Sequence, residues 1–273
     1  MPKIVRIYSE NATFQLFEAL RRNREKRQKQ HEFLVEGVRQ INLAVQQGWT
    51  IKAWLYTPEH KPSDWASKLL EHSAAPIHYE LSAPLLAKLS SKEETSELLA
   101  LVAMPEDKLE RIPIRPNLLV LIFDRPASPG NLGTLISSAD SLGADGLVIT
   151  GHAADLYDPE TISASVGTLF TLPTVRVGSP RALEPWFDQI RAAIGAFAIV
   201  GSSAKADYEI DQHDWTQPTL LVIGNETVGM SAHYRDLCNV IVKIPMSGSA
   251  SSLNVACAAS ILLYEIQRQR RKK

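Results

Sequence analysis

The chain has 273 residues, of which 45% are hydrophobic and 22% charged; this globular composition suits one large domain or two medium ones, and we expect two. Its 29 Lys and Arg residues against 30 Asp and Glu residues give a formal charge of −1, so any attraction to nucleic acid must come from local patches. Cys238 and Cys257 lie in unlike contexts, which excludes a disulfide framework and a CxxC metal clip. No apolar run reaches the roughly 18 residues of a membrane span. We therefore expect a cytoplasmic protein without a membrane partner.

The first third of the chain alternates helical and strand patterns. Its apolar periodicity predicts helices over 12–28, 38–48 and 63–72, and short strands over 32–37, 51–56 and 97–103. Residues 105–117 hold three prolines, dense charge and little apolar periodicity, which is typical of a linker. We expect a small α/β domain over 1–104 ahead of this linker.

Longer apolar runs begin at residue 118. Nearly continuous Val, Ile and Leu segments, typical of parallel strands buried on both faces, predict strands over 118–124, 146–150, 197–202, 219–225 and 240–246. Helical patterns separate or follow them over 131–142, 159–170, 180–194 and 252–269. This order predicts a second α/β domain, 118–273, with a mostly parallel sheet flanked by helices.

Three successive strand ends in this second domain carry small or polar residues: "VGSSA" (200–204), "GNETVG" (224–229) and "PMSGSASSLN" (245–254). Carboxyl ends of parallel strands meet at one edge of a sheet, where open α/β sheets bind their ligands. Three such ends in a row favour a shared pocket over three ordinary turns. Ser251 or Ser252 is placed to cap the last helix, which leaves Asn254 one turn inside it. In the earlier stretch 124–140, Asn131 is placed to cap a helix.

Other polar groups have simpler interpretations. Basic runs at 21–30 and 268–273 fit either a solvated surface or contacts with RNA phosphates. His152, Asp155 and Asp158 do not match a standard ligand spacing, so we expect no metal. The absence of GxGxxG after the first strand of the second domain argues against a nicotinamide-dependent oxidoreductase.

Three motifs resemble those of the SpoU, or TrmH-like, RNA 2′-O-ribose methyltransferases of the SPOUT class. "PGNLGTLISSADSLGADGLVIT" (129–150) is similar to the first motif of that family and "LVIGNETVGMS" (221–231) to the second. "IPMSGSASSLNVACAASILLYE" (244–265) is similar to the third and is the most specific of them. The first domain resembles the substrate-binding domain of L30e type through "EFLVEGVRQINLAV" and "ELLALVA".

The resemblance implies a methyl transfer from S-adenosylmethionine to rRNA or tRNA, with the cofactor held in a deep trefoil knot and the chain paired as a homodimer through the knot domain. Carried over by position, the residues near the reacting ribose are Asn131, Ser252 and Asn254. Glu226 matches a carboxylate that is mainly structural at the dimer interface. The implied cofactor-binding residues are Val200, Gly201, Gly224, Asn225, Gly229, Ile244, Met246, Gly248 and Leu253.

One expected residue of the first motif is missing. The family carries Arg six positions after the motif Asn, where this chain has Ser137, and relatives often have a second Arg where this chain has Ser163. Serine carries no charge and cannot bind a phosphate in the bidentate manner of Arg. Arg125 is the first candidate to substitute for it. The alternative is a catalytically weak or inactive protein that binds cofactor, or only RNA.

Overall fold

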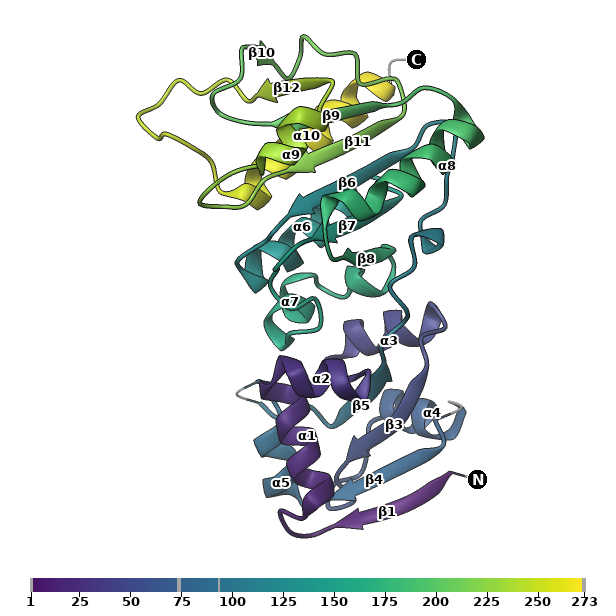
Figure 1. The fold of residues 1–273 in the computed structure, drawn as a ribbon. Coiled ribbons are helices and arrows are strands. Elements are labelled where there is room, and N and C mark those ends of the chain that lie inside the picture. The colour runs from purple at the N-terminus through teal and green to yellow at the C-terminus, as the bar shows by residue number, and fades with distance from the viewer. Residues whose placement is uncertain (1, 73–74, 93, 272–273) are drawn as a thin grey trace. The chain divides into compact units, whose positions relative to one another are not determined.

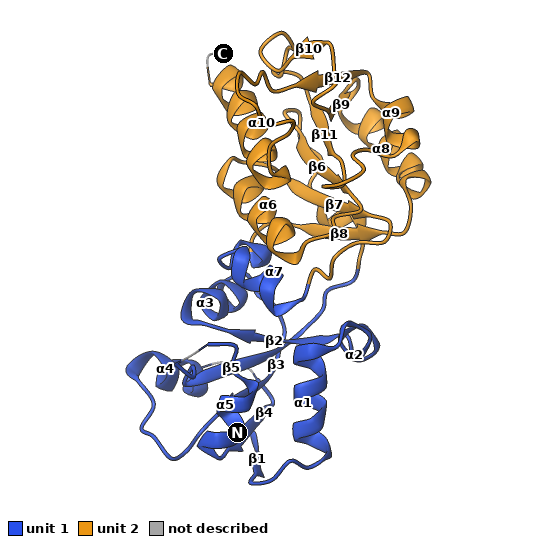
Figure 2. Cartoon of the chain, turned by 90° about the vertical axis from the view of Figure 1, so that its left-hand side faces the viewer, with its two compact units in different colours: residues 1–106, 157–170 blue, residues 107–156, 171–273 orange. Residues whose placement is uncertain are grey.

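In a computed structural model, residues 2–72, 75–92 and 94–271 are described. The chain forms two compact units (Figure 2). Unit 1 contains residues 1–106 and 157–170, and unit 2 contains residues 107–156 and 171–273. The segment 157–170, from the second half of the sequence, therefore packs with the N-terminal residues.

Unit 1 is built on a five-stranded sheet of order β1-β4-β3-β5-β2. Its strands are β1 (Lys3–Ile7), β2 (Glu32–Glu36), β3 (Ile51–Tyr56), β4 (Ile77–Leu81) and β5 (Leu98–Ala103). Its helices are α1 (Ala12–Arg22), α2 (Arg24–Gln30), α3 (Val38–Gln46), α4 (Asp64–His72), α5 (Ala83–Leu89), α7 (Pro159–Ala164) and the 3-10 helix η2 (Thr168–Phe170). Strands β1, β4 and β3 run parallel, whereas β5 is antiparallel to both of its neighbours. The sequence patterns did not predict β1, β4 or α5.

The basic run 21–30 is not one continuous helix, because Asn23 ends α1 and caps α2. Four residues later, Arg27 is buried, and its Nη1 donates to the carbonyl oxygens of Leu20 and Arg21 at 2.8 and 2.9 Å. Its Nη2 lies 3.1 Å from Oδ2 of Asp158, at the start of α7. This arginine therefore closes the end of α1 and ties α7 to the same unit.

Alternation along β2 divides the core of unit 1 into two faces. Leu34 joins the apolar cluster formed by α1, α5 and the sheet. Its neighbour Phe33 points the other way, with its ring centroid 4.6 Å from that of Tyr157 and 6.4 Å from that of Phe170. The indole Nε1 of Trp49 donates to the Phe170 carbonyl at 3.0 Å. Residues 157–170 are therefore part of the core of unit 1.

Unit 2 is built on a seven-stranded sheet of order β10-β12-β9-β11-β6-β7-β8, with parallel pairing throughout (Figure 1). Its strands are β6 (Leu119–Asp124), β7 (Gly146–Thr150), β8 (Thr174–Val177), β9 (Ala198–Ser202), β10 (Tyr208–Glu209), β11 (Thr219–Ile223) and β12 (Val240–Lys243). Its helices are α6 (Pro129–Ser141), α8 (Glu184–Ile194), α9 (Ala232–Leu237) and α10 (Val255–Arg270), with 3-10 helices η1 (Leu109–Arg111) and η3 (Pro180–Leu183). Every residue of β6, β7 and β11 is buried, as their continuous apolar runs predicted.

Helices cover both faces of this sheet: α6 and α10 lie on one side, and α8 and α9 on the other (Figure 2). The prediction of a mostly parallel sheet flanked by helices is confirmed. Strands β8 and β10 and helix α9 were not predicted. The predicted helix 159–170 is interrupted at Val166 and Gly167, which both have positive φ. In the segment 105–117, Ile112 is 2% exposed and belongs to the core of unit 2.

Two predicted caps are wrong. Helix α6 begins at Pro129, and the side chain of Ser128 caps it, so Asn131 lies within its first turn. Helix α10 begins at Val255, and Asn254 caps it instead of Ser251 or Ser252. Asn254 therefore lies at the start of α10. Its side-chain oxygen caps the helix, and its side-chain nitrogen remains able to donate to another residue.

Candidate active site

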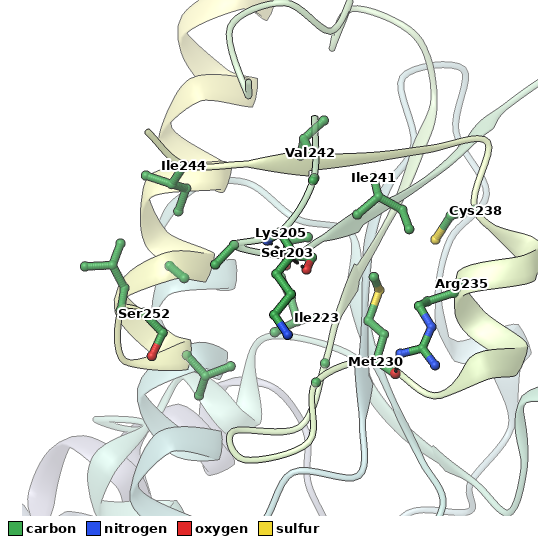
Figure 3. A pocket seen from close by; sticks show the side chains of 18 of the residues that line it. Ser203, Lys205, Ile223, Met230, Arg235, Cys238, Ile241, Val242, Ile244 and Ser252 are labelled. Atoms are coloured by element: carbon green, nitrogen blue, oxygen red, sulfur yellow. Dashed lines mark hydrogen bonds between the residues drawn. The ribbon is translucent and has the colours of Figure 1, made fainter. Parts of the chain in front are cut away.

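A cavity of about 980 Å³ opens at the carboxyl ends of β9, β11 and β12. Residues from 202–208, 223–230, 235–246 and 251–258 line it (Figure 3). These three strands lie next to one another in the sheet, with Val222 opposite Gly201 and Ile241 opposite Gly201 on the other side. The shared register brings together loops that are far apart in the sequence.

Gly224 allows the backbone to fold tightly at the edge of this cavity. A Cβ at this position would lie 2.3 Å from the Met230 nitrogen and 2.5 Å from the Gly229 carbonyl carbon. Asn225 and Gly229 exchange backbone hydrogen bonds of 3.2 and 3.0 Å, and Gly229 has a φ of +69°. Only a residue without a side chain permits this close approach, and the 225–229 turn that results lines the cavity.

The expected cofactor residues divide into two groups. The cavity is lined by Gly224, Asn225, Gly229, Ile244, Met246 and Leu253. Val200 is fully buried, and a Cβ on Gly201 would meet Met230 Cε at 2.7 Å and Cys238 Sγ at 2.8 Å. Gly201 thus lies behind the wall that Met230 and Cys238 form, and neither buried Val200 nor exposed Gly248 is among the lining residues.

Several lining residues had not been singled out from the sequence. Met230, Arg235 and Cys238 come from α9 and the segments beside it, for which the sequence pattern predicted no element. Burial raises the pKa of the Cys238 thiol to about 12, so this side chain is a neutral apolar wall at physiological pH. Ser203 belongs to the "VGSSA" strand end and Lys205 follows it directly, so this sequence signal could have placed both residues at the cavity.

A line of hydrogen bonds joins the three motifs. The Asn254 Oδ1 accepts from the backbone nitrogens of Ala256 and Cys257 at 2.9 and 3.3 Å, which leaves its Nδ2 to donate to Asn131 Oδ1 at 2.9 Å. Asn131 Nδ2 then donates to Glu226 Oε1 at 3.3 Å. Asn254 is exposed and Asn131 half-buried, so a substrate can reach both amides.

Glu226 supports the loop in front of α6. Its Oε2 accepts the Ala127 N–H at 2.9 Å, and its Oε1 accepts the Ser128 N–H at 3.1 Å as well as the Asn131 amide. These three hydrogen bonds hold the carboxylate in place. Glu226 therefore fits the role of a residue that positions Asn131 and the loop before α6.

Arg125 lies beside the same turn and has a φ of +54°. Its Nε and Nη2 donate to the two carboxylate oxygens of Asp124, each at 3.0 Å, and Nη2 also donates to the Gly229 carbonyl at 3.2 Å. The hydrogen bond to Asp124 raises the pKa of the guanidinium group, which stays charged. Among the described residues no hydrogen bond involves Nη1, and 36% of the side chain is exposed.

The serines of the expected site lie in different places. Ser252 lines the cavity of unit 2 and is exposed. Ser137 lies half-buried in the middle of α6. Ser163 lies on α7 and lines a separate cavity of about 350 Å³ within unit 1.

The described residues form neither a metal-binding cluster nor a membrane-spanning helix. Over residues 2–72, 75–92 and 94–271, no group of three or more His, Cys, Asp or Glu side chains is arranged to hold a metal ion. No helix in the same ranges has the length and apolar character to cross a membrane.

The residues at this site fit an adenosyl cofactor. The cavity is within the usual size range for small-molecule pockets, and apolar and polar residues both line it. Gly224 and the 225–229 turn both line the cavity, and their close backbone contact holds this part of the wall in place.

The family relationships agree with this geometry. Residues 118–264 match the SpoU rRNA Methylase family, and residues 11–100 match the SpoU L30e-like domain. The 23S rRNA (uridine(2479)-2'-O)-methyltransferase of Streptomyces viridochromogenes is 49% identical over 270 residues, which cover 98% of this chain and 94% of that protein. RlmP of Bacillus subtilis, a 23S rRNA (guanosine(2553)-2'-O)-methyltransferase, is 29% identical over 245 residues, or 89% of this chain and 92% of its own.

A solved structure is also close to this fold. The crystal structure of the SpoU methyltransferase AviRb from Streptomyces viridochromogenes in complex with the cofactor AdoMet matches with a TM-score of 0.90 and 49% identity, over 96% of this chain and 98% of that one. The motifs, the cavity and the family match all lead to the same assignment. This chain belongs to the SpoU rRNA Methylase family.

Proposed function

We propose that the chain is a 2′-O-ribose methyltransferase that transfers a methyl group from S-adenosylmethionine to RNA. The observation that carries this proposal is the hydrogen-bonded line from Asn254 through Asn131 to Glu226. It joins all three motifs beside a cavity that fits the methyl donor. A purely structural helix cap would need only the two backbone contacts of Asn254.

The cofactor residues are proposed by their position. Gly224, Ile244 and Leu253 would hold the adenosine part, with Asn225, Gly229 and Met246 next to them on the cavity wall. Val200, Gly201 and Gly248 would act indirectly, by shaping the wall and the loop. When bound, S-adenosylmethionine supplies an electrophilic methyl group, so the protein must align the ribose oxygen with it.

The amide groups perform this alignment. Asn131 and Asn254 present fixed donors and acceptors to the ribose, and Ser252 supplies a hydroxyl at the cavity wall. Glu226 holds Asn131 and the loop before it. The free Nη1 of Arg125 would bind the phosphate next to the target ribose, in place of the arginine missing at Ser137.

Unit 1 is proposed as the RNA-recognition domain, and unit 2 as the methyltransferase domain. In the basic run 21–30, Arg27 is buried, whereas Arg22, Lys26 and Lys29 are exposed and available to phosphates. The C-terminal run is different, because Arg268 pairs with Glu265, and Arg270 donates to backbone carbonyls; Lys272 and Lys273 lie outside the described residues. The relatives that act on 23S rRNA favour rRNA over tRNA as the substrate.

A knotted, homodimeric methyltransferase domain is also proposed. Ile261 and Tyr264 on α10 are 38% and 60% exposed, and Val228 beside the cavity is 64% exposed. Apolar side chains on one helix face fit burial against a second copy of the chain. We also propose a cytoplasmic location, which an RNA substrate and two free cysteines support.

The test is methyl transfer by purified protein. Tritiated S-adenosylmethionine is supplied with 23S rRNA, 16S rRNA or bulk tRNA, and the modified position is mapped as a 2′-O-methyl ribose. We expect incorporation into 23S rRNA and a loss of at least about tenfold in Asn131→Ala. Incorporation at a base, or equal transfer by Asn131→Ala, would contradict the proposal.

The second candidate function is a weak or inactive enzyme, because Ser137 stands where the family carries an arginine. Comparing the wild type with Ser137→Arg and Arg125→Lys separates the two. If Arg125 substitutes, Arg125→Lys lowers transfer and Ser137→Arg adds little. Cofactor binding without transfer in the wild type, restored in Ser137→Arg, would instead identify a binding protein that has lost its catalytic arginine.

A further inference from the structure

The loop between β9 and β10 forms one wall of the cavity, although it belongs to none of the three motifs. It contributes Ser203, Lys205 and Asp207 to the lining. We have proposed that Gly224, Ile244 and Leu253, in the other segments that line the cavity, hold the adenosine part of the cofactor. A cavity of about 980 Å³ also has room for the amino-acid end of the cofactor.

Lys205 extends into this cavity. Figure 3 shows its side chain running inward among the lining residues, which include Ile223 at the end of β11. The surrounding wall includes the apolar side chains of Met230 and Ile241. Among the described residues, no carboxylate forms an ion pair with the Lys205 ammonium. Lys205 is exposed, so its ammonium group can form a charge-assisted hydrogen bond with an anionic ligand in the cavity.

The cavity lining contains a second cationic side chain, Arg235, which already forms a hydrogen bond within the chain. Arg235 donates from Nη1 to the Met230 carbonyl at 2.8 Å. Lys205 is therefore the better candidate to bind a ligand anion.

The chemistry of the cofactor identifies which of its groups Lys205 would meet. The adenine and ribose are neutral and the sulfonium is positive, so the carboxylate of the amino-acid end is the one anion. Asp207 lines the same cavity and offers a carboxylate to the neighbouring amino group. We propose that the 203–207 loop binds the zwitterionic amino-acid end of S-adenosylmethionine, with Lys205 holding its carboxylate.

This inference rests on the proposed function. Calorimetric measurement of the binding of adenosyl compounds tests the role of Lys205 separately from that function. The probes are S-adenosylhomocysteine, which keeps the carboxylate, and 5′-methylthioadenosine, which lacks the amino-acid end. Decarboxylated S-adenosylmethionine removes the carboxylate alone. The variants are Lys205→Met, which keeps most of the apolar stem, and Lys243→Met, a matched control on β12 outside the cavity lining.

We expect Lys205→Met to weaken S-adenosylhomocysteine by about tenfold, as for a lost charge-assisted hydrogen bond. Binding of 5′-methylthioadenosine and of the decarboxylated cofactor should change by less than about twofold, and Lys243→Met should match the wild type throughout. Equal weakening of all three ligands, or unchanged S-adenosylhomocysteine affinity, would overturn the role of Lys205. An unchanged affinity with weaker RNA binding would assign Lys205 to a phosphate instead. A wild type that binds no adenosyl compound would overturn both proposals.

Discussion

The Asn254 side-chain amide donates to Asn131 Oδ1 at 2.9 Å, across 123 residues of sequence. This contact joins the first turn of α6 to the N-cap of α10. Because the Asn254 oxygen is already used in capping α10, the direction of the hydrogen bond is fixed. The same residue therefore stabilises a helix and orients a neighbouring amide.

The two roles of Asn254 can be separated by substitution. Asn254→Asp keeps an acceptor for the helix cap but cannot donate to Asn131, whereas Asn254→Ala loses both interactions. We expect Asn254→Ala to lower the free energy of unfolding by about 1 kcal/mol, and Asn254→Asp to change it by less. Methyl transfer should fall by at least about tenfold in both variants. Chemical denaturation and single-turnover kinetics measure the two effects; normal transfer by Asn254→Asp would count against the alignment role.

A methyl group at Gly224 should disrupt the cavity. In Gly224→Ala the new Cβ would lie 2.3 Å from the Met230 backbone nitrogen, so the 225–229 turn must move. We expect the affinity for S-adenosylhomocysteine, measured by calorimetry, to fall by more than about tenfold.

Gly178→Ala is the matched control for this substitution, because a Cβ there meets no atom within 4 Å. It should retain wild-type affinity. Equal binding by both variants would show that the turn does not form part of the ligand site.

Arg270 holds the edge of unit 2 together through backbone carbonyls. Its Nε donates to Trp215 and its Nη1 to Asn117 at 3.0 and 2.7 Å, and its Nη2 donates to Leu118 and Gln217 at 3.2 and 2.9 Å. Removing these charge-assisted bonds in Arg270→Met should cost about 2–4 kcal/mol of stability.

The neighbouring Arg271 is exposed and provides the control. Arg271→Met should change the free energy of unfolding by less than about 0.5 kcal/mol. Urea denaturation measures both variants, and similar stabilities for the two would exclude a structural role for Arg270.

The two cysteines should differ in reactivity. Cys257 is exposed, whereas burial raises the pKa of Cys238 to about 12, which leaves almost no thiolate at pH 8. A disulfide reagent such as Ellman's at pH 8 should therefore label Cys257 rapidly, and Cys238 only after unfolding. Because the folded protein favours the protonated thiol, Cys238 labelling should increase as the pH rises toward 12. Rapid labelling of the Cys257→Ser variant at pH 8 would show that the cavity wall is open to solvent.

Part of the site followed from sequence patterns alone. The polar strand ends at 200–204, 224–229 and 245–254 predicted one shared pocket, and residues from all three line one cavity. The family resemblance, not the pattern, pointed to Gly224, Ile244 and Leu253 as cofactor residues, and all three are among the lining residues. The same patterns placed Asn254 inside a helix, because residue spacing does not distinguish a cap from the first turn. The resemblance also assigned Gly201 to the pocket, although it lies behind Met230 and Cys238.

The sequence by itself determined the parallel sheet, because buried strands leave local signatures of continuous apolar runs. It also determined the family, through the resemblance of three motifs. Only the tertiary structure decided that Asn131 meets Asn254, that residues 157–170 complete the core of unit 1, and that Arg270 is bound by backbone carbonyls. These are contacts between segments far apart in the chain. They depend on strand order and register, which residue periodicity does not encode.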